Sequence, residues 1–373
     1  MKRLGIDFGT RTTVAALADA SGVDVVRHAD ATEVLPSAVW LSPAGKVEVG
    51  EAAMRRRLMD PQNALFAVKR ILGRPWHSRE VLQFRNQYGF TLETGADDRP
   101  RFVTRVGSLK PGDIVQHLFA AVRTASGLPP GTPGVTVTIP VAAREDQREA
   151  TRAAAAAAGL PDVVLLEEPC AAAFLYLHDR PTPQTTVVYD LGGGTFDLAV
   201  LRWEGDKFTV LGTGGDTYLG GDDITYRLAN WAADEVLEQF RWDVRSNTSA
   251  FQELVDACES AKIALSDREQ VDIPLDGVDP NLARRKITVA RGRVESLCSD
   301  LVRRTFVLCD QVLASAGVAA RAVDAVILVG GGTYMPVIRQ GVKSYFGKAP
   351  RNDVLPDRAV AMGAALYATR GDG

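Results

Sequence analysis

Three short stretches of the sequence combine glycine turns with acidic or hydroxyl side chains, a pattern suited to phosphate and a divalent cation. They read GIDFGTRTT from Gly5, DLGGGTFD from Asp190 and ILVGGGTYMP from Ile327. In each, an apolar run typical of a β-strand leads into the glycines. Glycine turns expose backbone N–H groups that bind anions, and a strand-end carboxylate can hold hydrated Mg²⁺. Together the three stretches predict a phosphate-binding site.

The first stretch places Asp7 at the end of its strand, followed by Gly9 in a tight turn. The turn would present the backbone N–H groups of Thr10, Arg11 and Thr12 to a phosphate. Asp7 would hold a magnesium ion that keeps several of its waters. An ordinary Asp-Gly hairpin without a ligand is the alternative interpretation of this motif.

The second stretch is more specific, because three consecutive glycines cost backbone entropy that close approach of a ligand would explain. Asp190 and Asp197 bracket this turn, and Thr195 adds a hydroxyl beside it. A plain glycine-rich hairpin is the alternative. The third stretch runs from an apolar strand through glycines into a helix near Pro336, and a helix N-terminus favours anions. It matches neither a Walker A loop nor a GxGxxG fingerprint.

The first two stretches also form an internal repeat of strand, acidic residue, glycine turn and strand. LGIDFGTRTTVAAL and VVYDLGGGTFDLAVL share this order, which favours two homologous halves divided near residues 181–184. We therefore predict a first lobe over residues 1–182 and a second over 183–373. Residues 39–109 and 224–302 look like insertions, the second with long helices of apolar periodicity. The expected strands are Leu4–Phe8, Val14–Leu17, Val23–Val26, Val135–Ile139, Val163–Leu166, Thr185–Asp190 and Phe196–Arg202, with helices over about 143–158 and 169–177.

The composition excludes several classes of function. The chain has 373 residues, 46% of them hydrophobic and 24% charged, with a net charge of -3. This balance gives no electrostatic footprint for nucleic acid or anionic lipid, so neither is an expected partner. Cys170, Cys258, Cys298 and Cys309 show no metal-site spacing and are typical of reduced cytoplasmic thiols. No segment approaches the roughly 20 apolar residues of a membrane span.

A family resemblance joins these observations. NALFAVKRILGR, VTIPVAAREDQREAT, EEPCAAAFLY, GGDTYLGGDD, CESAKIALS and PDRAVAMGAA lie in order around the three glycine stretches. The chain resembles the ATPase domain of the DnaK-type heat shock protein 70 family, within the actin-like ATPase superfamily. The resemblance covers nearly the whole chain. It implies an α/β actin-like ATPase fold of duplicated ribonuclease-H-like halves, with two lobes of two subdomains and ATP or ADP with Mg²⁺ in a central cleft.

The resemblance also implies roles for individual residues. Lys69 would reach the γ-phosphate and the attacking water, and Glu168 would complete the water or magnesium shell. The positions implied as catalytic are Lys69, Glu168, Asp190 and Thr195, and those implied for magnesium are Asp7, Asp190 and Asp197. The positions implied for the nucleotide are Thr10, Arg11, Thr12, Gly192, Gly193, Gly194, Glu259, Lys262, Ser266, Gly331, Gly332, Tyr334 and Asp357, the last seven at the adenosine.

Each role has a simpler alternative. Lys69 stands beside Arg70 and Arg74, where a basic surface stripe is the default. Glu168 before Pro169 is typical of a helix N-terminus, which the helix dipole favours. Glu259, Lys262 and Ser266 share a helix face at spacings typical of an exposed ion pair.

Departures from the family pattern concern the adenine site and the end of the sequence. The family often clamps adenine between two arginines, where this chain has Ile263 and Tyr334; an aromatic ring can still stack on a base. Pro140 and Arg148 resemble the positions of the family's allosteric relay. The sequence ends at ALYATRGDG, without the family's apolar linker and substrate-binding sandwich.

These features favour a slow ATPase that acts as a chaperone-type nucleotide switch without a substrate-binding domain. A protein partner, such as a co-chaperone or exchange factor, would sense its nucleotide state. A filament-forming actin-like ATPase and a small-molecule kinase on the same fold are the alternatives, because one fold hosts many functions.

Overall fold

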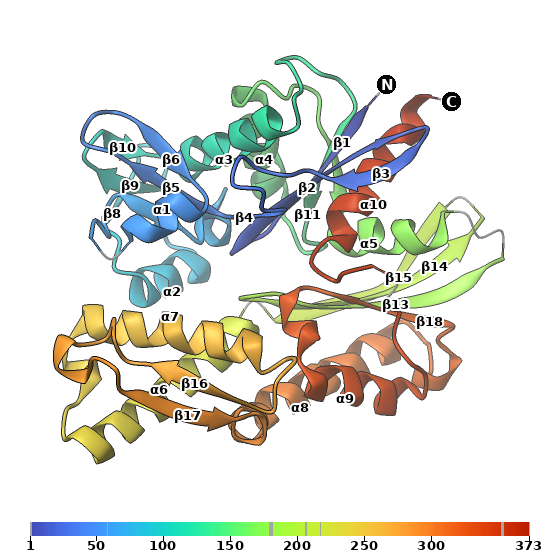
Figure 1. Cartoon of the computed structure of the whole chain (residues 1–373). Coiled ribbons are helices and arrows are strands. Elements are labelled where there is room, and N and C mark those ends of the chain that lie inside the picture. Colours follow the sequence, from blue (N-terminus) through green and yellow to red (C-terminus); the bar gives the residue numbers. More distant parts are fainter. Residues whose placement is uncertain are drawn as a thin grey trace. The chain divides into compact units, whose positions relative to one another are not determined.

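The computed structural model describes residues 2–57, 59–178, 182–205, 207–216, 218–351 and 354–372 (Figure 1). The chain divides into two compact units, Met1–Pro181 with Asp357–Gly373, and Thr182–Pro356. The predicted second lobe of residues 183–373 differs from this division at its end. The segment Asp357–Gly373 belongs to the first unit, because its helix packs on that unit's sheet and on α5.

Unit 1 is built on a mixed sheet in the order β12-β11-β1-β2-β3, with β4 beside β2. β1 pairs with β11 in parallel and with β2 antiparallel. The sheet and its covering helices are β1 (Arg3–Phe8), β2 (Thr12–Asp19), β3 (Gly22–Val25), β4 (Val34–Pro36), β11 (Val135–Ile139), β12 (Val164–Glu167), α3 (Pro111–Ala125), α4 (Glu145–Ala157), α5 (Glu168–Leu177) and α10 (Ala359–Ala368).

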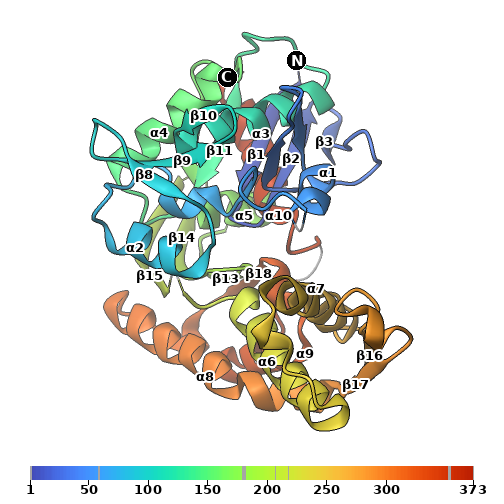
Figure 2. The same cartoon turned by 90° about the vertical axis from the view of Figure 1, so that its left-hand side faces the viewer.

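The two faces of β1 bury different side chains, as the period of two along a strand requires. Leu4, Ile6 and Phe8 share a core with apolar residues of α3 and α4. The opposite face of the sheet packs on α10, which lies beside α5 (Figures 1 and 2). α10 is apolar on all sides, as a buried helix should be. Helices on both faces therefore fix the end of β1, where the first glycine turn begins.

The predicted insertion at 39–109 forms small sheets and short helices within unit 1. β5 pairs with β6 and β7 in one sheet, and β8, β9 and β10 form another. The elements are β5 (Ala38–Leu41), β6 (Val47–Val49), α1 (Glu51–Arg56), β7 (Ala64–Phe66), the 3₁₀-helix η1 (Val68–Ile71), α2 (Arg79–Gln87), β8 (Leu92–Thr94), β9 (Pro100–Thr104) and β10 (Gly107–Leu109).

Unit 2 repeats the topology of the first sheet in the order β15-β14-β13-β18. β13 pairs antiparallel with β14 and parallel with β18, as β1 does with β2 and β11. This shared order establishes two ribonuclease-H-like halves, as predicted. The elements are β13 (Gln184–Leu191), β14 (Phe196–Glu204), β15 (Lys207–Asp216), α6 (Gly221–Phe240), α7 (Thr248–Ala264), β16 (Gln270–Pro274), β17 (Lys286–Ala290), α8 (Arg291–Ser315), β18 (Ala325–Val329), the 3₁₀-helix η5 (Gly331–Tyr334) and α9 (Pro336–Phe346).

Most predicted elements of the two sheets occur within a few residues of their predicted bounds. The predicted strand over Val135–Ile139 is β11, and the helix predicted to begin near Pro336 is α9. The elements that were not predicted include the edge strands β4 and β15 and the helices α3 and α10. β15 carries a register shift opposite Val200 and Leu201, and three of its ten residues are glycines.

Candidate nucleotide-binding site

The first glycine turn connects β1 to β2 in unit 1. The Gly9 N–H donates to the Thr12 carbonyl at 2.9 Å, which closes the turn around Thr10 and Arg11. A β-carbon on Gly9 would collide with that same carbonyl oxygen, so the turn requires glycine. The Ser37 hydroxyl, which no sequence pattern indicated, donates to the Gly9 carbonyl at 2.9 Å.

Asp7 lies two residues before this turn, among charged side chains of unit 1. Burial and the negative charge of Glu168 raise the pKa of Asp7 to about 7, and Asp357 acts in the same direction. Lys69 and a hydrogen bond from the Thr138 hydroxyl, at 3.3 Å from Asp7 Oδ1, oppose this rise. Burial and the nearby carboxylates both disfavour the ionised form of Asp7, and a bound cation would favour it.

Lys69 and Glu168 form a largely buried ion pair beside Asp7. The Lys69 Nζ lies 2.7 Å from Glu168 Oε1, and the two side chains are 15% and 12% exposed. Lys69 comes from η1, and its ammonium also lies 5.5 Å from the centre of the Phe8 ring. The alternative of a basic surface stripe is therefore wrong for Lys69. Glu168 is the first residue of α5, so it is a helix-terminal acid as well as the partner of Lys69.

The second glycine turn repeats the first in unit 2. The Gly192 N–H donates to the Thr195 carbonyl at 3.0 Å, and Asp190 precedes Gly192 by the same two residues that separate Asp7 from Gly9. Asp190 stands directly opposite Asp197 across β13 and β14, where Asp7 has Val14. Unit 2 therefore brings two carboxylates to a turn of the same form.

The start of α6 holds the second turn from its other side. The N–H groups of Gly221 and Asp222 donate to the carbonyls of Gly192 and Gly193, at 3.0 and 2.6 Å. A β-carbon on Gly220 would lie 2.5 Å from the Gly193 carbonyl oxygen. The glycines of the LGGDD segment thus permit close contact between two turns, which fixes the backbone of Gly192, Gly193 and Gly194.

The third glycine turn follows β18 and forms η5. Gly330 has a φ of 83°, and a β-carbon there would lie 2.6 Å from Asp190 Oδ1. Gly332 packs against Leu191, whereas a β-carbon on Gly331 would meet nothing within 4 Å. Gly331 therefore lies beside open space, which leaves room for a ligand in unit 2.

Tyr334 ends η5 and is half-buried. The guanidinium of Arg339, a residue of α9 that no sequence pattern indicated, lies 5.4 Å from the centre of the Tyr334 ring. Arg339 also donates to the Thr333 carbonyl at 3.0 Å, which holds the arginine against the ring. Ile263, the other predicted adenine position, is 61% exposed.

Lys262 and Glu259 form a buried ion pair on α7, and Lys262 also contacts the start of α6. Lys262 Nζ lies 2.7 Å from Glu259 Oε2 and donates to the Gly221 carbonyl and the Thr225 hydroxyl, both at 2.9 Å. The alternative of an exposed pair is wrong, because Lys262 is only 8% exposed. Through Gly221, this lysine supports the second glycine turn.

Ser266 lies in a small recess of unit 2 formed by the end of α7, the start of α8 and the start of α9. Its lining includes Lys262, Arg291, Glu295 and Val337. Arg291 holds the end of α7 by donating to the Leu265 carbonyl at 2.8 Å. The recess brings together Lys262 and Ser266, two of the residues predicted to contact adenosine.

The predicted residues thus form groups within each unit. Unit 1 brings Asp7, Lys69 and Glu168 together, and unit 2 brings Asp190, Asp197 and the second turn together. Asp357, predicted to close the adenosine pocket with Gly331 and Gly332, is part of unit 1, where its charge acts on Asp7. The turn residues Thr10 and Thr12 are half-buried and Arg11 is exposed.

Magnesium fits the residues around Asp7. Among the described residues, no group of three or more His, Cys, Asp and Glu side chains is arranged to hold a metal ion by itself. Magnesium does not need one, because it keeps several waters and binds through one or two carboxylates together with phosphate oxygens. The carboxyl of Asp7 and the paired Asp190 and Asp197 both meet this requirement.

Arg148, a predicted relay position, bonds to the segment that leads into Glu168. Its guanidinium donates to Glu167 Oε1 at 3.1 Å and to the Ala143 carbonyl at 3.2 Å. The Ala143 N–H in turn donates to the Pro140 carbonyl at 3.0 Å. Arg148 and Pro140 are therefore connected to the start of α5 through one short chain of hydrogen bonds.

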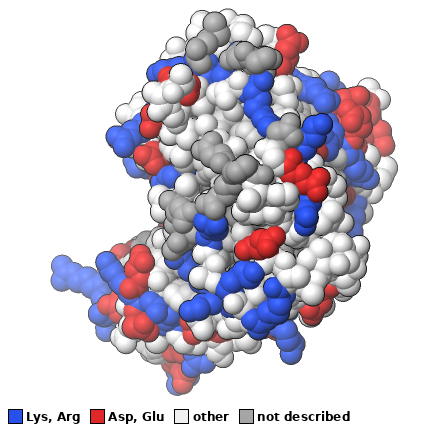
Figure 3. Space-filling model, turned by 90° about the vertical axis from the view of Figure 1, so that its right-hand side faces the viewer, with Lys and Arg blue, Asp and Glu red and all other residues white. Residues whose placement is uncertain are grey.

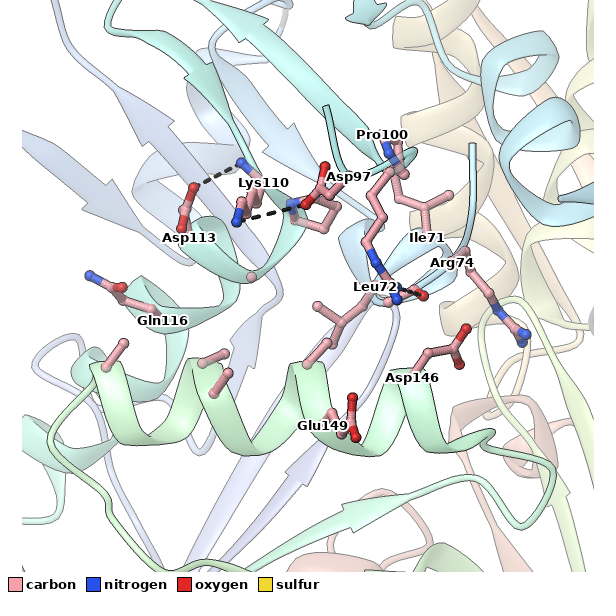
Figure 4. Close-up of a pocket in the computed structure, with 18 residues that line it drawn as sticks. Ile71, Leu72, Arg74, Asp97, Pro100, Lys110, Asp113, Gln116, Asp146 and Glu149 are labelled. Atoms are coloured by element: carbon pink, nitrogen blue, oxygen red, sulfur yellow. Dashed lines mark hydrogen bonds and ion pairs between the residues drawn. The ribbon is translucent and has the colours of Figure 1, made fainter. Parts of the chain in front are cut away.

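A separate recess, in unit 1, lies between α3, α4 and the loop that follows η1 (Figure 4). Its floor is the alanine face of α4, and both acidic and basic side chains line its rim, among them Arg99, Lys110 and Glu149. None of the predicted site residues lines it. Gly73 lets the loop approach α4, because a β-carbon there would collide with the Asp146 carbonyl oxygen.

The surface drawn in Figure 3 carries Lys, Arg, Asp and Glu side chains interspersed, without a continuous field of one sign. Among the described helices, none is both long enough and apolar enough to pass through a bilayer. The four cysteines are buried thiols without disulfides. The glycine turns therefore remain the candidate site.

Two ribonuclease-H-like halves, each with an acidic residue and a glycine turn at the end of its first strand, define an actin-like ATPase fold. A comparison with family models gives the particular family: the model described as Hsp70 protein matches residues 3–371. The chain belongs to the Hsp70 family. It carries a chaperone-type ATPase domain, and members of this family bind ATP and ADP with Mg²⁺ and hydrolyse ATP.

Proposed function

We propose that this protein is a slow, magnesium-dependent ATPase whose nucleotide state is sensed by a protein partner. The observation that carries the proposal is the buried Lys69–Glu168 pair, 2.7 Å apart, next to Asp7 and the first glycine turn. A cation and two carboxylates beside a turn of N–H groups can bind a phosphate chain and orient a water. Phosphoryl transfer depends mainly on such positioning and charge neutralisation.

In this proposal each residue has a definite task. Lys69 donates to the γ-phosphate and to the attacking water, and Glu168 holds that water's proton by hydrogen bonding. Asp7, Asp190 and Asp197 hold the waters of Mg²⁺, which when bound neutralises charge on the phosphate oxygens. The N–H groups of both glycine turns bind phosphate, with the Thr195 hydroxyl beside the second.

The base and ribose are proposed to bind through unit 2. Glu259, Lys262 and Ser266 supply polar contacts near the end of α7, and Gly331 and Gly332 allow close approach. The Tyr334 ring, supported by Arg339, offers a flat surface for a purine, since aromatic rings stack on bases irrespective of base type. Stacking alone does not distinguish adenine from guanine, so the comparison of ATP with GTP tests the base preference.

Isothermal titration with ATP, ADP and GTP, in the presence of Mg²⁺ and of EDTA, tests the proposal directly. We expect ATP and ADP to bind, with ATP binding strengthened by Mg²⁺, and single-turnover hydrolysis to be slow. No binding of ATP or ADP at millimolar concentration would refute it. A pull-down in the ATP and ADP states, made with the same preparation, tests whether a partner prefers one state.

The buried contact of Lys262 with Gly221, whose N–H donates to the Gly192 carbonyl of the second turn, favours a nucleotide switch over a filament-forming protein. In this arrangement the helical insertion is tied directly to a phosphate-binding turn, so a change at the nucleotide can alter the insertion. Sedimentation and electron microscopy with ATP test the alternative. Filaments that form with ATP and disassemble after hydrolysis would favour the actin-like function instead.

A further inference from the structure

Arg358 joins two carboxylates that belong to distant parts of unit 1. Its Nε donates to Glu33 Oε2 at 2.8 Å, and its Nη1 donates to Asp357 Oδ1 at 2.6 Å. The Arg358 side chain is only 20% exposed. Charge-assisted bonds from one planar guanidinium fix both partners in direction as well as in distance.

The backbone around Arg358 is held rigidly by the helix that follows it. α10 packs so closely that a β-carbon on Gly5 of β1 would collide with the α10 backbone at Ala361 and Ala365. Gly363 of α10 makes an equally close approach to the backbone of Ala171 in α5. β1 ends near Asp7, and α5 begins at Glu168. The position of α10 is therefore fixed relative to the carboxylates of Asp7 and Glu168.

The other partner, Glu33, leads into the segment that supports the first glycine turn. β4 begins at the next residue and pairs with β2, with Pro36 opposite Thr12. Ser37 follows and donates to the Gly9 carbonyl at 2.9 Å. Arg358 therefore connects Asp357 to the strand that holds the turn.

The carboxylates near Asp357 repel it, so its position depends on the bond from Arg358. The carboxylates of Asp357 and Glu168 both disfavour charge on Asp7. An unrestrained carboxylate would turn away from this cluster toward solvent, whereas the guanidinium of Arg358 holds it in place through the bond to Asp357 Oδ1.

We propose that Arg358 is a positioning residue that holds Asp357 beside Asp7, so that the Asp357 carboxylate can bind the water shell of Mg²⁺. The inference rests on the proposed function, since it concerns the magnesium of the same site. Arg358 itself touches neither metal nor nucleotide in this role. It acts through Asp357, and its contact with Glu33 contributes mainly stability.

A double-mutant cycle on Arg358 and Asp357 separates positioning from stability. The variants are Arg358→Met, Asp357→Asn and the two combined, each measured by thermal unfolding without ligand and by Mg²⁺ titration of the ATP-bound protein. We expect Arg358→Met to raise the Mg²⁺ concentration for half-saturation at least fivefold. ATP binding in EDTA should change less than twofold. The combined variant should be no weaker for Mg²⁺ than Asp357→Asn alone, because residues acting through one contact are not additive.

Two further variants serve as controls. Arg27→Met removes a second arginine from Glu33, since Arg27 Nε lies 3.4 Å from Glu33 Oε1 with a side chain 73% exposed. It leaves Asp357 untouched, so Mg²⁺ half-saturation should stay at the wild-type value. Glu33→Gln weakens the other bond of Arg358 and should lower the melting temperature more than it changes Mg²⁺ binding.

The results of these measurements decide whether Arg358 positions Asp357 or is only structural. Unchanged Mg²⁺ half-saturation in Arg358→Met, or additive effects of Arg358→Met and Asp357→Asn, would show that Arg358 is only structural and would overturn the inference. Wild-type protein that binds ATP without any dependence on Mg²⁺ would overturn the proposed function, and this inference with it. A wild-type Mg²⁺ dependence that Arg358→Met weakens, while Arg27→Met does not, supports both.

Discussion

Removal of the Lys69 ammonium should separate its effect on hydrolysis from its effect on nucleotide binding. Lys69 is proposed to contact the γ-phosphate, which ADP lacks, so its charge should matter mainly during phosphoryl transfer. We expect Lys69→Met to leave the ADP dissociation constant within about threefold of wild type. Loss of one preorganised donor to a transition state typically lowers kcat by about 10²–10³-fold. We expect a fall of that size in single-turnover hydrolysis.

The same substitution should also destabilise the protein, by an amount that follows from the burial of the ion pair. Lys69 and Glu168 are 15% and 12% exposed, so Lys69→Met leaves a mostly buried carboxylate without its partner. Breaking a fully buried pair on one side costs about 3–5 kcal/mol. The residual exposure places the expected cost below that range, at about 2–3 kcal/mol.

A second variant separates the two effects. In Lys69→Met/Glu168→Gln both charges are gone, so most of the lost stability should return, because a buried pair replaced on both sides is nearly neutral. Hydrolysis should not return, because the donor to the γ-phosphate is still missing. Urea unfolding measures the free energy of unfolding, and quenched-flow or filter assays measure the single turnover.

An exposed ion pair of the same length provides the control. Lys286 Nζ lies 2.6 Å from Asp272 Oδ2, with side chains 60% and 43% exposed. Lys286→Met should change stability by no more than about 1 kcal/mol and leave hydrolysis unaffected. Equal loss of ADP and ATP binding in Lys69→Met would refute the catalytic role and leave a structural one. Recovery of hydrolysis in the double variant would refute it as well.

Three further predictions concern other parts of the site. The pKa of Asp7 is raised to about 7 by burial and by Glu168, so its contribution to stability without magnesium is full below the unfolded pKa of about 3.9 and lost as pH rises through about 7. Because Mg²⁺ favours the ionised carboxyl, its stabilisation in thermal unfolding should be larger at pH 8 than at pH 6; Asp7→Asn should abolish that difference, and an unchanged difference would contradict the assignment. Asp190→Asn should slow hydrolysis at least tenfold with ATP still bound in equilibrium titration, whereas lost binding would assign it to affinity. Lys262→Met should lower the free energy of unfolding by about 3 kcal/mol in urea, as expected for a buried cation with three partners, and a change below 1 kcal/mol would contradict its anchoring role.

The elements best predicted from sequence are those whose local pattern and buried environment agree. β11 occupies Val135–Ile139, where a run of β-branched residues, VTVTI, meets Pro140, and all five of its residues are buried. β15 was missed because its sequence, KFTVLGTGGD, is rich in glycine and none of its residues is buried, as an edge strand tolerates. Its pairing depends on β14, and no periodicity within 207–216 reveals that.

Long-range packing explains the misplaced end of the second lobe. The apolar helix α10 follows directly after unit 2 in the chain, so the sequence alone favoured placing it there. Its place in unit 1 depends on Gly5 and Gly363, which allow two close backbone approaches. A glycine inside a strand or a helix indicates a close approach in general. The sequence does not indicate that Gly5 meets the backbone of Ala361 and Ala365, or that Gly363 meets that of Ala171.

The same contrast between local sequence patterns and long-range contacts applies to the site. The glycine turns could be predicted because the residues that form each turn are contiguous, and Gly9 and Gly192 close theirs within four residues. The burial of Lys262 could not, because the spacing of Glu259 and Lys262 is the same for an exposed pair and a buried one. Ser37, Thr138 and Arg339 carry no local signal, since each contributes through a partner elsewhere in the fold.

The two halves also show where this fold gains its chemical asymmetry. The duplicated frame provides the same turn twice, with an acidic residue two positions before the glycine that closes it. The cations come from outside the frame: Lys69 from the insertion of unit 1 and Lys262 from the insertion of unit 2. Lys69 faces Glu168 and Asp7, whereas Lys262 is occupied by Gly221, Thr225 and Glu259. Lys262 donates to three partners within unit 2 and supports a turn. Lys69 lies beside the carboxylates of Asp7 and Glu168, and is the lysine suited to contact a phosphate. The duplication thus explains the two glycine turns, and the insertions explain why Lys69, and not Lys262, is the lysine predicted to act in the reaction.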